Sequence, residues 1–276
     1  MAYERHGASP LDYQLCRYGT SKLRFRGPAR RLSGRYVAFL GGSETFGKFV
    51  ERPFPALIEA RSGARCVNFG WPNAGVDVFL NDPVILKAAS AAGVTVVQVP
   101  GAQNMSNRFY TVHPRRNDRF VQASAMLRGV FRDVDFTEFH FTRHMLHRLQ
   151  DVSPERFDLI RDELQRVWRA RMRLLLARIE GPVVLLWVST HAPGACADTP
   201  DLDADPAFVT RDMFHDLRSR AQALVEVVAS PAAREEGSIG MVFDPVEAAA
   251  AAELPGPAAH EEVASALEPV ISRILG

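Results

Sequence analysis

The sequence predicts an α/β protein: a three-layer α/β/α sandwich built around a parallel sheet of about five strands. Five short apolar segments, rich in β-branched residues, are typical of strands buried on both faces. Segments with helical periodicity separate them, which favours parallel pairing through helical crossovers. A chain of 276 residues, 47% of them hydrophobic, is long enough to bury a large core. The expected strands occupy residues 36–40, 64–68, 93–99, 183–189 and 224–229.

The helices between these strands follow from their boundary residues. The first is interrupted at Pro53 and Pro55, because proline lacks the amide hydrogen that a helix uses. Asp82 resembles a helix cap before a first-turn proline, and Ser153 with Pro154 begins a long amphipathic helix. In chain order, the expected helical segments cover residues 44–61, 76–92, 121–131, 137–149, 154–179, 210–223 and 260–275.

Composition limits the domain organisation and the partners. Residues 1–34 are expected to form an N-terminal arm packed on a single domain of residues 35–276. A formal net charge of +1 gives no reason to expect a nucleic-acid partner. No segment approaches the roughly 20 apolar residues of a membrane-spanning helix, and the N-terminus has no secretory signal. Three scattered cysteines favour a reducing compartment, so we expect a cytoplasmic protein with no membrane partner; the sequence leaves its oligomeric state open.

Polar, glycine-bearing loops follow the first three strands. The carboxyl ends of parallel strands meet at one edge of a sheet, where α/β proteins bind ligands. We therefore expect these loops to converge on one crevice. Their candidate residues are Gly42 and Ser43 after the first strand, Asn73 and Gly75 after the second, and Gln103 and Asn104 after the third.

Ser43 is the candidate nucleophile. A serine hydroxyl needs a base, usually histidine, and hydrogen-bond donors for the oxyanion that forms. At a strand-to-helix junction, the amide of Ser43 lies at a helix N-terminus, which favours negative charge. Gly42 lets a substrate approach the backbone closely. The alternative is that Ser43 only caps the helix.

The blocks "GGSETFG", "NFGWPNAG" and "GAQN" together resemble the SGNH (GDSL-like) hydrolase superfamily, and more narrowly an uncharacterised bacterial domain-of-unknown-function family within it. The resemblance implies an SGNH-hydrolase-like, flavodoxin-like fold with Ser43 as nucleophile. Gly75 matches the oxyanion glycine. Strict register places Gln103 at the oxyanion asparagine, but we assign that role to Asn104, one residue on. The resemblance implies neither a cofactor nor a catalytic metal.

The resemblance also implies a late histidine as the general base. His260, before the final helix, has the expected place, but Pro257 stands where the family has an aspartate three residues earlier. Likewise, Gly42 replaces the usual aspartate beside the serine. His215 lies in a literal Asp-x-x-His and is the rival base, although it falls inside an expected helix. Asp244 is one acid that could orient the base instead.

Further charged side chains follow the third and fourth strands. Arg115 and Arg116, near His113, can bind an anionic substrate group, or they can form a solvated basic loop. Three histidines share a helical face, and four aspartates follow the fourth strand, but surface positions explain both groups better than a metal site does. They are His140, His144 and His147, and Asp198, Asp201, Asp203 and Asp205.

The sequence therefore predicts a serine esterase that cleaves an acyl ester of a small molecule or carbohydrate, with an O-acetyl group as one candidate. Gly42, Asn73, Gln103, Arg115 and Arg116 are the expected substrate-binding residues. An acyltransferase using the same site, and a binding protein that has lost the chemistry, are the alternatives.

Overall fold

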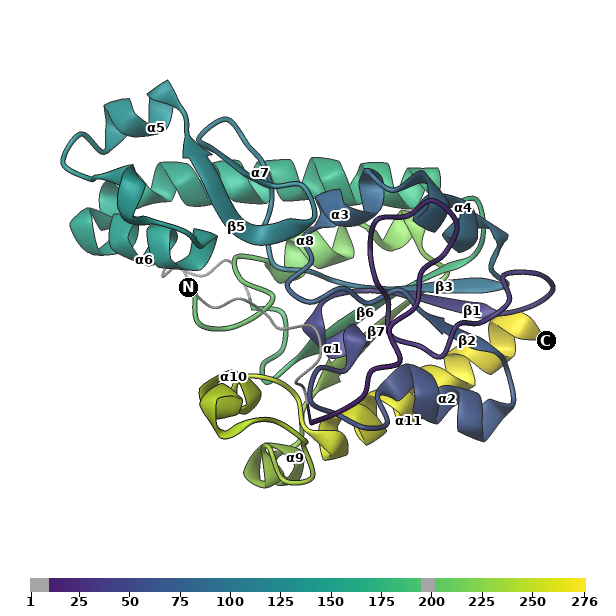
Figure 1. Ribbon diagram of the computed structural model, residues 1–276. Coiled ribbons are helices and arrows are strands. Elements are labelled where there is room, and N and C mark those ends of the chain that lie inside the picture. The colour runs from purple at the N-terminus through teal and green to yellow at the C-terminus, as the bar shows by residue number, and fades with distance from the viewer. Residues whose placement is uncertain (1–9, 195–201) are drawn as a thin grey trace.

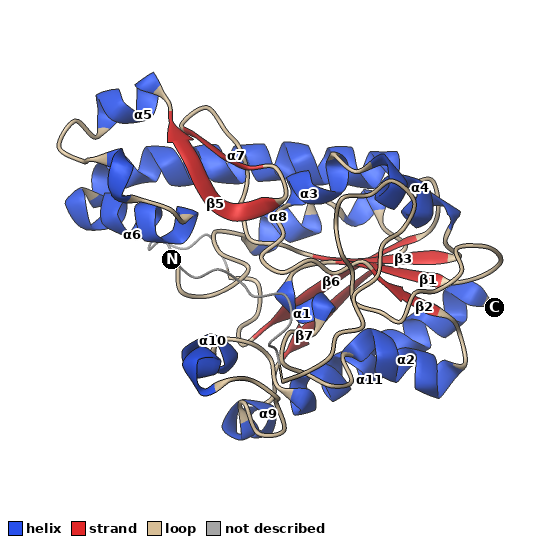
Figure 2. Cartoon of the chain, viewed as in Figure 1, coloured by secondary structure: helices blue, strands red, loops and turns tan. Residues whose placement is uncertain are grey.

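A five-stranded parallel sheet forms the centre of the protein (Figures 1 and 2). The computed structural model describes residues 10–194 and 202–276, so Cys196, Asp198 and Asp201 lie outside the described residues. The strand order is β2-β1-β3-β6-β7, and every neighbouring pair is parallel, which confirms the predicted sheet. The strands are β1 (Val37–Leu40), β2 (Cys66–Asn68), β3 (Val94–Gln98), β6 (Val183–Ser189) and β7 (Ala223–Val228).

Helices cover both faces of the sheet, so the predicted three-layer architecture is confirmed (Figure 1). Along β1, Val37 and Phe39 face one layer, whereas Ala38 and Leu40 face the other. This alternation buries both sides of the strand and explains why its sequence is continuously apolar. One layer contains α2 (Phe54–Ser62) and α11 (Pro257–Leu275). The other contains α3 (Val76–Leu80), α4 (Pro83–Ala91), α7 (Pro154–Arg178) and α8 (Arg211–His215).

Two of the expected helices are divided in the structure. α1 (Ser43–Phe46) ends at Gly47, which has a left-handed backbone (φ +73°), and α2 starts directly after Pro53. The segment 76–92 divides into α3 and α4 at Asp82, whose carboxylate accepts hydrogen bonds from the first turn of α4. The short α1 matters most, because it carries Ser43 at its first position.

The segment between β3 and α7 differs most from the prediction. Instead of an irregular segment and a helix from residue 121, β4 (Tyr110–His113) pairs antiparallel with β5 (Arg116–Ala123). The polar start of β5 hides the alternation that would have marked a strand. Helices follow as α5 (Ala125–Val130), the 3₁₀ turn η1 (Phe136–Glu138) and α6 (Thr142–Val152).

The C-terminal third holds smaller departures. The expected helix 210–223 shortens to α8 and the 3₁₀ turn η2 (Arg218–Arg220), because the chain must then enter β7. Before α11, the chain forms α9 (Pro231–Glu236), η3 (Pro245–Glu247) and α10 (Ala248–Ala252), which lie together beyond one end of the sheet (Figure 1).

Residues 10–34 pack against the sheet domain without forming a helix. Cys16 and Phe25 form an antiparallel bridge, and Tyr18, Leu23 and Phe25 are buried in the larger core. Arg26 is buried, and its guanidinium donates to the carbonyl oxygens of Phe46, Gly47 and Glu51. The start of the chain therefore stabilises the segment that follows Ser43.

Within residues 10–194 and 202–276, no helix combines the length and the apolar character needed to cross a bilayer.

Candidate active site

Ser43 lies at the carboxyl edge of the sheet, on a turn fixed by the neighbouring strand. Gln98, the last residue of β3, accepts hydrogen bonds through Oε1 from the backbone N–H groups of Gly42 (3.1 Å) and Thr45 (3.2 Å). A Cβ on Gly41 would lie 2.1 Å from Thr45 Oγ1 and 2.4 Å from Gln98 Oε1, so only glycine fits there. The glycines of "GGSE" thus let the turn close onto the sheet and present Ser43, which is 6% exposed.

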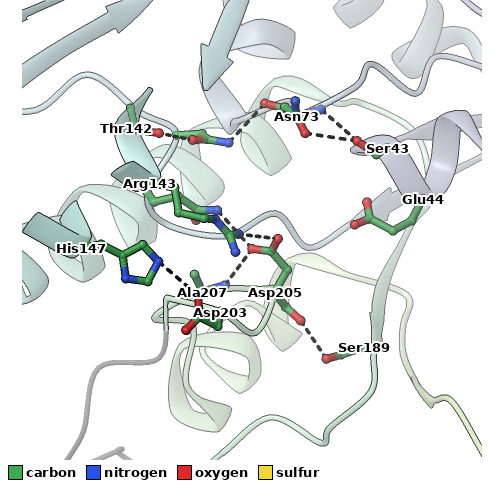
Figure 3. Close-up of polar contacts among 12 residues, drawn as sticks. Ser43, Glu44, Asn73, Thr142, Arg143, His147, Ser189, Asp203, Asp205 and Ala207 are labelled. Carbon is green, nitrogen blue, oxygen red and sulfur yellow. Dashed lines mark hydrogen bonds and ion pairs between the residues drawn. The ribbon is translucent and has the colours of Figure 1, made fainter. Parts of the chain in front are cut away.

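Asn73 holds the Ser43 hydroxyl from two sides (Figure 3). The backbone N–H of Asn73 donates to Ser43 Oγ (3.1 Å), and the hydroxyl donates to Asn73 Oδ1 (3.3 Å). Asn73 has a left-handed backbone (φ +55°), a conformation that asparagine tolerates better than most residues. Its Nδ2 donates to Asp118 Oδ2 (3.4 Å), so Asn73 links the serine to a carboxylate.

The loop after β3 completes this cluster. Asn104 Nδ2 donates to the carbonyl oxygen of Asn73 (3.3 Å), and Asn104 Oδ1 accepts from Thr142 Oγ1 (2.8 Å). The loops after β1, β2 and β3 therefore meet around Ser43, with Thr142 of α6 behind them. An amide carries two N–H groups, so Asn104 can donate a second hydrogen bond into the cavity that it lines.

Gly75 has a different role from the one expected. Its N–H donates to Asn117 Oδ1 (3.1 Å) instead of pointing at the serine. A Cβ on Gly75 would lie 1.8 Å from the backbone oxygen of Asn104, so the glycine allows the second and third loops to approach each other. The N–H that contacts Ser43 belongs to Asn73, and the predicted donor Gly75 is instead engaged with Asn117.

Gly75→Ala is expected to destabilise the protein by about 1–3 kcal/mol, because the added methyl group must displace the Asn104 backbone. Gly129→Ala, in α5, is the matched control: nothing lies within 4 Å of its Cβ position, so this change should be neutral or slightly stabilising. Urea denaturation of both variants measures the difference. Equal stability of the two variants would show that the two loops are not in contact at Gly75.

The structure does not bring His260 to Ser43. The ring lies between α2 and α11, 2% exposed and stacked on Phe54 (centroids 5.7 Å apart), and it lines neither cavity at Ser43. Its Nδ1 accepts the Phe54 N–H (3.1 Å), so the basic nitrogen of the neutral ring is occupied. Burial, with a smaller contribution from the charge of Arg26, lowers the pKa of His260 to about 3. The general-base prediction therefore fails in this arrangement.

The rival base His215 and the candidate acid Asp244 also make their contacts away from Ser43. His215, on α8, is about half exposed and faces Glu226 (Nε2 to Oε1, 3.6 Å). The carboxylate of Asp244 caps η3 by accepting from the Val246 N–H. Within residues 10–194 and 202–276, no hydrogen bond joins Ser43 to a histidine.

Several charged residues at the site were not predicted to be functional. Arg143 of α6 donates to Asp205 Oδ2 (2.7 Å), and Ser189, at the end of β6, donates to the Asp205 backbone oxygen (2.7 Å) (Figure 3). Gln103 donates to Asp205 Oδ1 (3.1 Å) and is itself buried, so it positions Asp205. The acidic loop after β6 thus reaches the cavities that Ser43 lines through Asp205, which the sequence assigned to the surface.

Two carboxyl groups beside Ser43 have altered acidity. Glu44 accepts from Gln98 Nε2 (2.7 Å), and burial, reinforced by the nearby charge of Asp205, raises the pKa of Glu44. Burial also raises the pKa of Asp118, although neighbouring arginines oppose the shift. Both groups are therefore stronger bases than ordinary carboxylates when they are ionised.

Two adjoining cavities open at Ser43. The smaller, of about 320 Å³, is lined by polar and apolar groups in similar amounts, and its polar side chains include Asn104, Thr142 and Gln98. The larger, of about 1800 Å³, is lined by the β4–β5 turn with Arg115 and Arg116, by residues 11–24 and by the α9–α10 region. The residues common to both include Ser43, Glu44, Asn73, Asp118, Arg143 and Asp205.

The histidine group and the acidic loop do not form a metal centre in the described part of the chain. His147 pairs with Asp203 (3.1 Å), whereas the His144 ring packs edge-on against Phe139. The described residues contain no group of three or more histidine, cysteine, aspartate or glutamate side chains arranged to hold a metal ion.

The fold and the site define an α/β protein with a serine held at the carboxyl edge of its parallel sheet. The chain belongs to the family called Domain of unknown function (DUF6473), which matches residues 1–275. Comparison with curated proteins finds no match.

Solved structures include two distant similarities. A catalytic mutant of Axe2, an acetylxylan esterase from Geobacillus stearothermophilus, has 13% identity and a TM-score of 0.43, over 88% of this chain and 95% of that one. The lipase Lip_vut3 from a goat rumen metagenome has 12% identity and a TM-score of 0.38, over 85% and 97% respectively. Similarities this distant do not define an activity.

Proposed function

We propose that this chain is an ester hydrolase of the SGNH type in which Ser43 is the nucleophile. The observation that carries the proposal is the contact between Ser43 Oγ and the backbone N–H of Asn73. It places a hydrogen-bond donor beside the atom that would bond to the ester carbon, at the first position of α1. A serine that only capped a helix would not require this donor.

In the proposed reaction, Ser43 Oγ attacks the ester carbonyl and expels the alcohol, which leaves an acyl-serine that water hydrolyses to the free acid. Three donors would hold the developing oxyanion: the N–H of Ser43, the N–H of Asn73 and the Asn104 side-chain amide. The Ser43 N–H is in the first turn of α1 and has no intrahelical acceptor. Removing one donor of this kind typically lowers the rate by about 10²–10³.

We assign the general base to Asp118, because His260 and His215 are engaged elsewhere. Asp118 is joined to Ser43 through Asn73, and both residues line the smaller cavity. That cavity is polar and large enough for a water molecule that relays the proton from the hydroxyl to the carboxylate. Glu44 is the weaker candidate, because its carboxyl group is already turned to Gln98.

Asp118→Asn is expected to lower kcat/KM by about 10²–10⁴ and to remove the acidic limb of its pH profile. The base must be ionised to act, and its pKa is raised. In the wild type, activity should therefore rise with pH through a value above the ordinary aspartate pKa of about 3.9. Glu44→Gln is the control and should keep the limb. If Glu44→Gln loses the limb and Asp118→Asn keeps it, the base is Glu44.

The polar side chains that line part of the smaller cavity favour a short acyl group and a hydroxyl-rich alcohol. A long acyl chain would cover the Arg143–Asp205 pair and Asn104 without replacing their contacts with water, which is unfavourable for polar groups. An O-acetyl group on a carbohydrate meets both requirements. An acyltransferase would use the same steps with a sugar hydroxyl in place of water.

A non-catalytic binding protein is the second candidate, and the burial of His260 favours it. A fluorophosphonate probe separates the two. An enzyme should be labelled on the peptide that contains Ser43, and p-nitrophenyl acetate should compete with the label. Absence of both labelling and turnover would leave the binding protein as the better account.

A further inference from the structure

The turn between β4 and β5 presents arginines at the rim of the larger cavity. Arg115 and Arg116 are exposed and line this cavity with Ser43. His113 Nδ1 accepts hydrogen bonds from the backbone N–H groups of both arginines (3.2 and 3.1 Å), which closes the turn. The backbone beneath the two guanidinium groups is therefore fixed.

The same turn is bound to the loop that holds Ser43. Asn117 is fully buried; its Nδ2 donates to the His113 oxygen (3.0 Å) and its Oδ1 accepts from the Gly75 N–H (3.1 Å). Trp71 Nε1 donates to the Arg115 backbone oxygen (2.6 Å). Since Trp71 and Gly75 flank Asn73 in the chain, the arginine turn keeps a constant position relative to the nucleophile.

The N-terminal segment adds cations to the same side. The Trp71 ring packs edge-on against Phe25 (centroids 6.5 Å apart), so the segment around Phe25 and the turn at Arg115 meet at one indole. Leu23 and Phe25 point inward, whereas Lys22 and Arg24 are exposed and line the larger cavity. We call Lys22, Arg24, Arg115 and Arg116 the basic wall.

The α9–α10 region lines the cavity mainly with acidic side chains. These are Asp244, Glu247 and Glu253, beside the single cation Arg234, and Lys48 pairs with Glu247 (3.4 Å). A negatively charged chain entering the cavity is therefore directed to the basic wall. The volume of about 1800 Å³ exceeds the roughly 300–1000 Å³ of a site for a single small ligand.

We propose that the basic wall binds anionic groups of a polymeric substrate, so that Ser43 acts on an acidic glycan instead of a neutral one. Guanidinium groups pair with carboxylate or sulfate through two parallel hydrogen bonds, and both anions occur repeatedly along acidic glycans. An extended chain would contact the wall at one unit while its acylated unit lies at Ser43. This inference rests on the proposed function for the identity of the reacting group, but the binding itself does not depend on turnover.

The test measures binding with the full-length Ser43→Ala variant, which cannot turn over a bound ester. The probes are polygalacturonate, dextran sulfate and neutral dextran, titrated by calorimetry at about 20 and 200 mM NaCl. One or both anionic polymers should bind, more weakly at high salt because the Debye length shortens, and dextran should not bind. Binding of polygalacturonate alone indicates a carboxylate glycan, and binding of dextran sulfate alone indicates a sulfated one.

Arg24→Ala combined with Arg115→Ala should weaken binding at least tenfold. The matched control combines Arg218→Ala with Arg220→Ala on η2, where both side chains are exposed and outside the cavity. If the first double variant melts earlier than the control, Arg115→Gln alone should still weaken binding several-fold. Equal binding of dextran, no binding of either polyanion, or unchanged affinity in the variants would overturn the proposal, whereas loss of esterase activity alone would overturn only the proposed function.

Discussion

Ser43→Ala is expected to abolish ester hydrolysis, with kcat lowered on the order of 10⁴-fold or more, because it removes the proposed nucleophile. The fold should persist. The Ser43 hydroxyl makes two hydrogen bonds, both to Asn73, and each such bond is typically worth only about 1 kcal/mol. Turnover of p-nitrophenyl acetate and covalent labelling by a fluorophosphonate measure the loss directly.

Ser189→Ala provides the matched control for this experiment. Ser189 also ends a central strand and lines the larger cavity, but its hydroxyl donates to the backbone oxygen of Asp205. Its Oγ accepts a backbone N–H as well, from His191 (3.2 Å), but Ser189 ends a strand, whereas Ser43 is the first residue of a helix. Labelling and turnover should therefore stay within about tenfold of wild type. Labelling that persists in Ser43→Ala and disappears in Ser189→Ala would show that the nucleophile is Ser189 and not Ser43.

A large effect on stability is expected from His260 in mild acid. The folded-state pKa of about 3 lies well below the ordinary histidine value of about 6.5, so between these values the unfolded chain binds a proton that the folded chain excludes. Stability from this residue is thus complete above pH 6.5 and falls as the pH decreases towards 3. Between pH 7.5 and pH 5 the loss amounts to about 2 kcal/mol.

His260→Asn isolates this contribution. The asparagine Oδ1 can still accept the Phe54 N–H, while the titratable ring is gone. The free energy of unfolding is measured in urea at pH 7.5 and pH 5. The difference between the two values should be about 2 kcal/mol smaller in the variant than in the wild type. His215→Asn is the control, because that side chain is already about half exposed. An unchanged pH dependence in His260→Asn would mean that the folded protein admits a charged ring at this position, and with it a route by which His260 could act at Ser43.

The sheet could be predicted because its strands are contiguous apolar segments that need no distant information. The β4–β5 pair could not, since its polar residues are held by partners far away in the chain: Asn117 by Gly75, and the Arg115 backbone by Trp71. Local pattern does not report such pairings. The two divided helices were anticipated more closely, because Pro53 and Asp82 mark their ends directly.

The candidate site was predictable at the level of loops but not of individual atoms. Strand ends in a parallel sheet identify Ser43, Asn73 and Asn104 from order alone. Which N–H reaches the serine depends on the left-handed backbone of Asn73. In the sequence, an asparagine two residues before Gly75 is only a weak indication of that conformation. The orientation of His260 depends on how α11 packs against α2, which the sequence position of the histidine does not specify.

Gln98 connects the candidate site to the central sheet. It is the terminal residue of a central strand, and its side chain fixes the backbone at Gly42 and Thr45 while also engaging Glu44. The position of Ser43 is thus set by the sheet, whereas its surroundings come from surface loops, which tolerate exchange. Changes in those loops can therefore alter what the cavities recognise without moving Ser43.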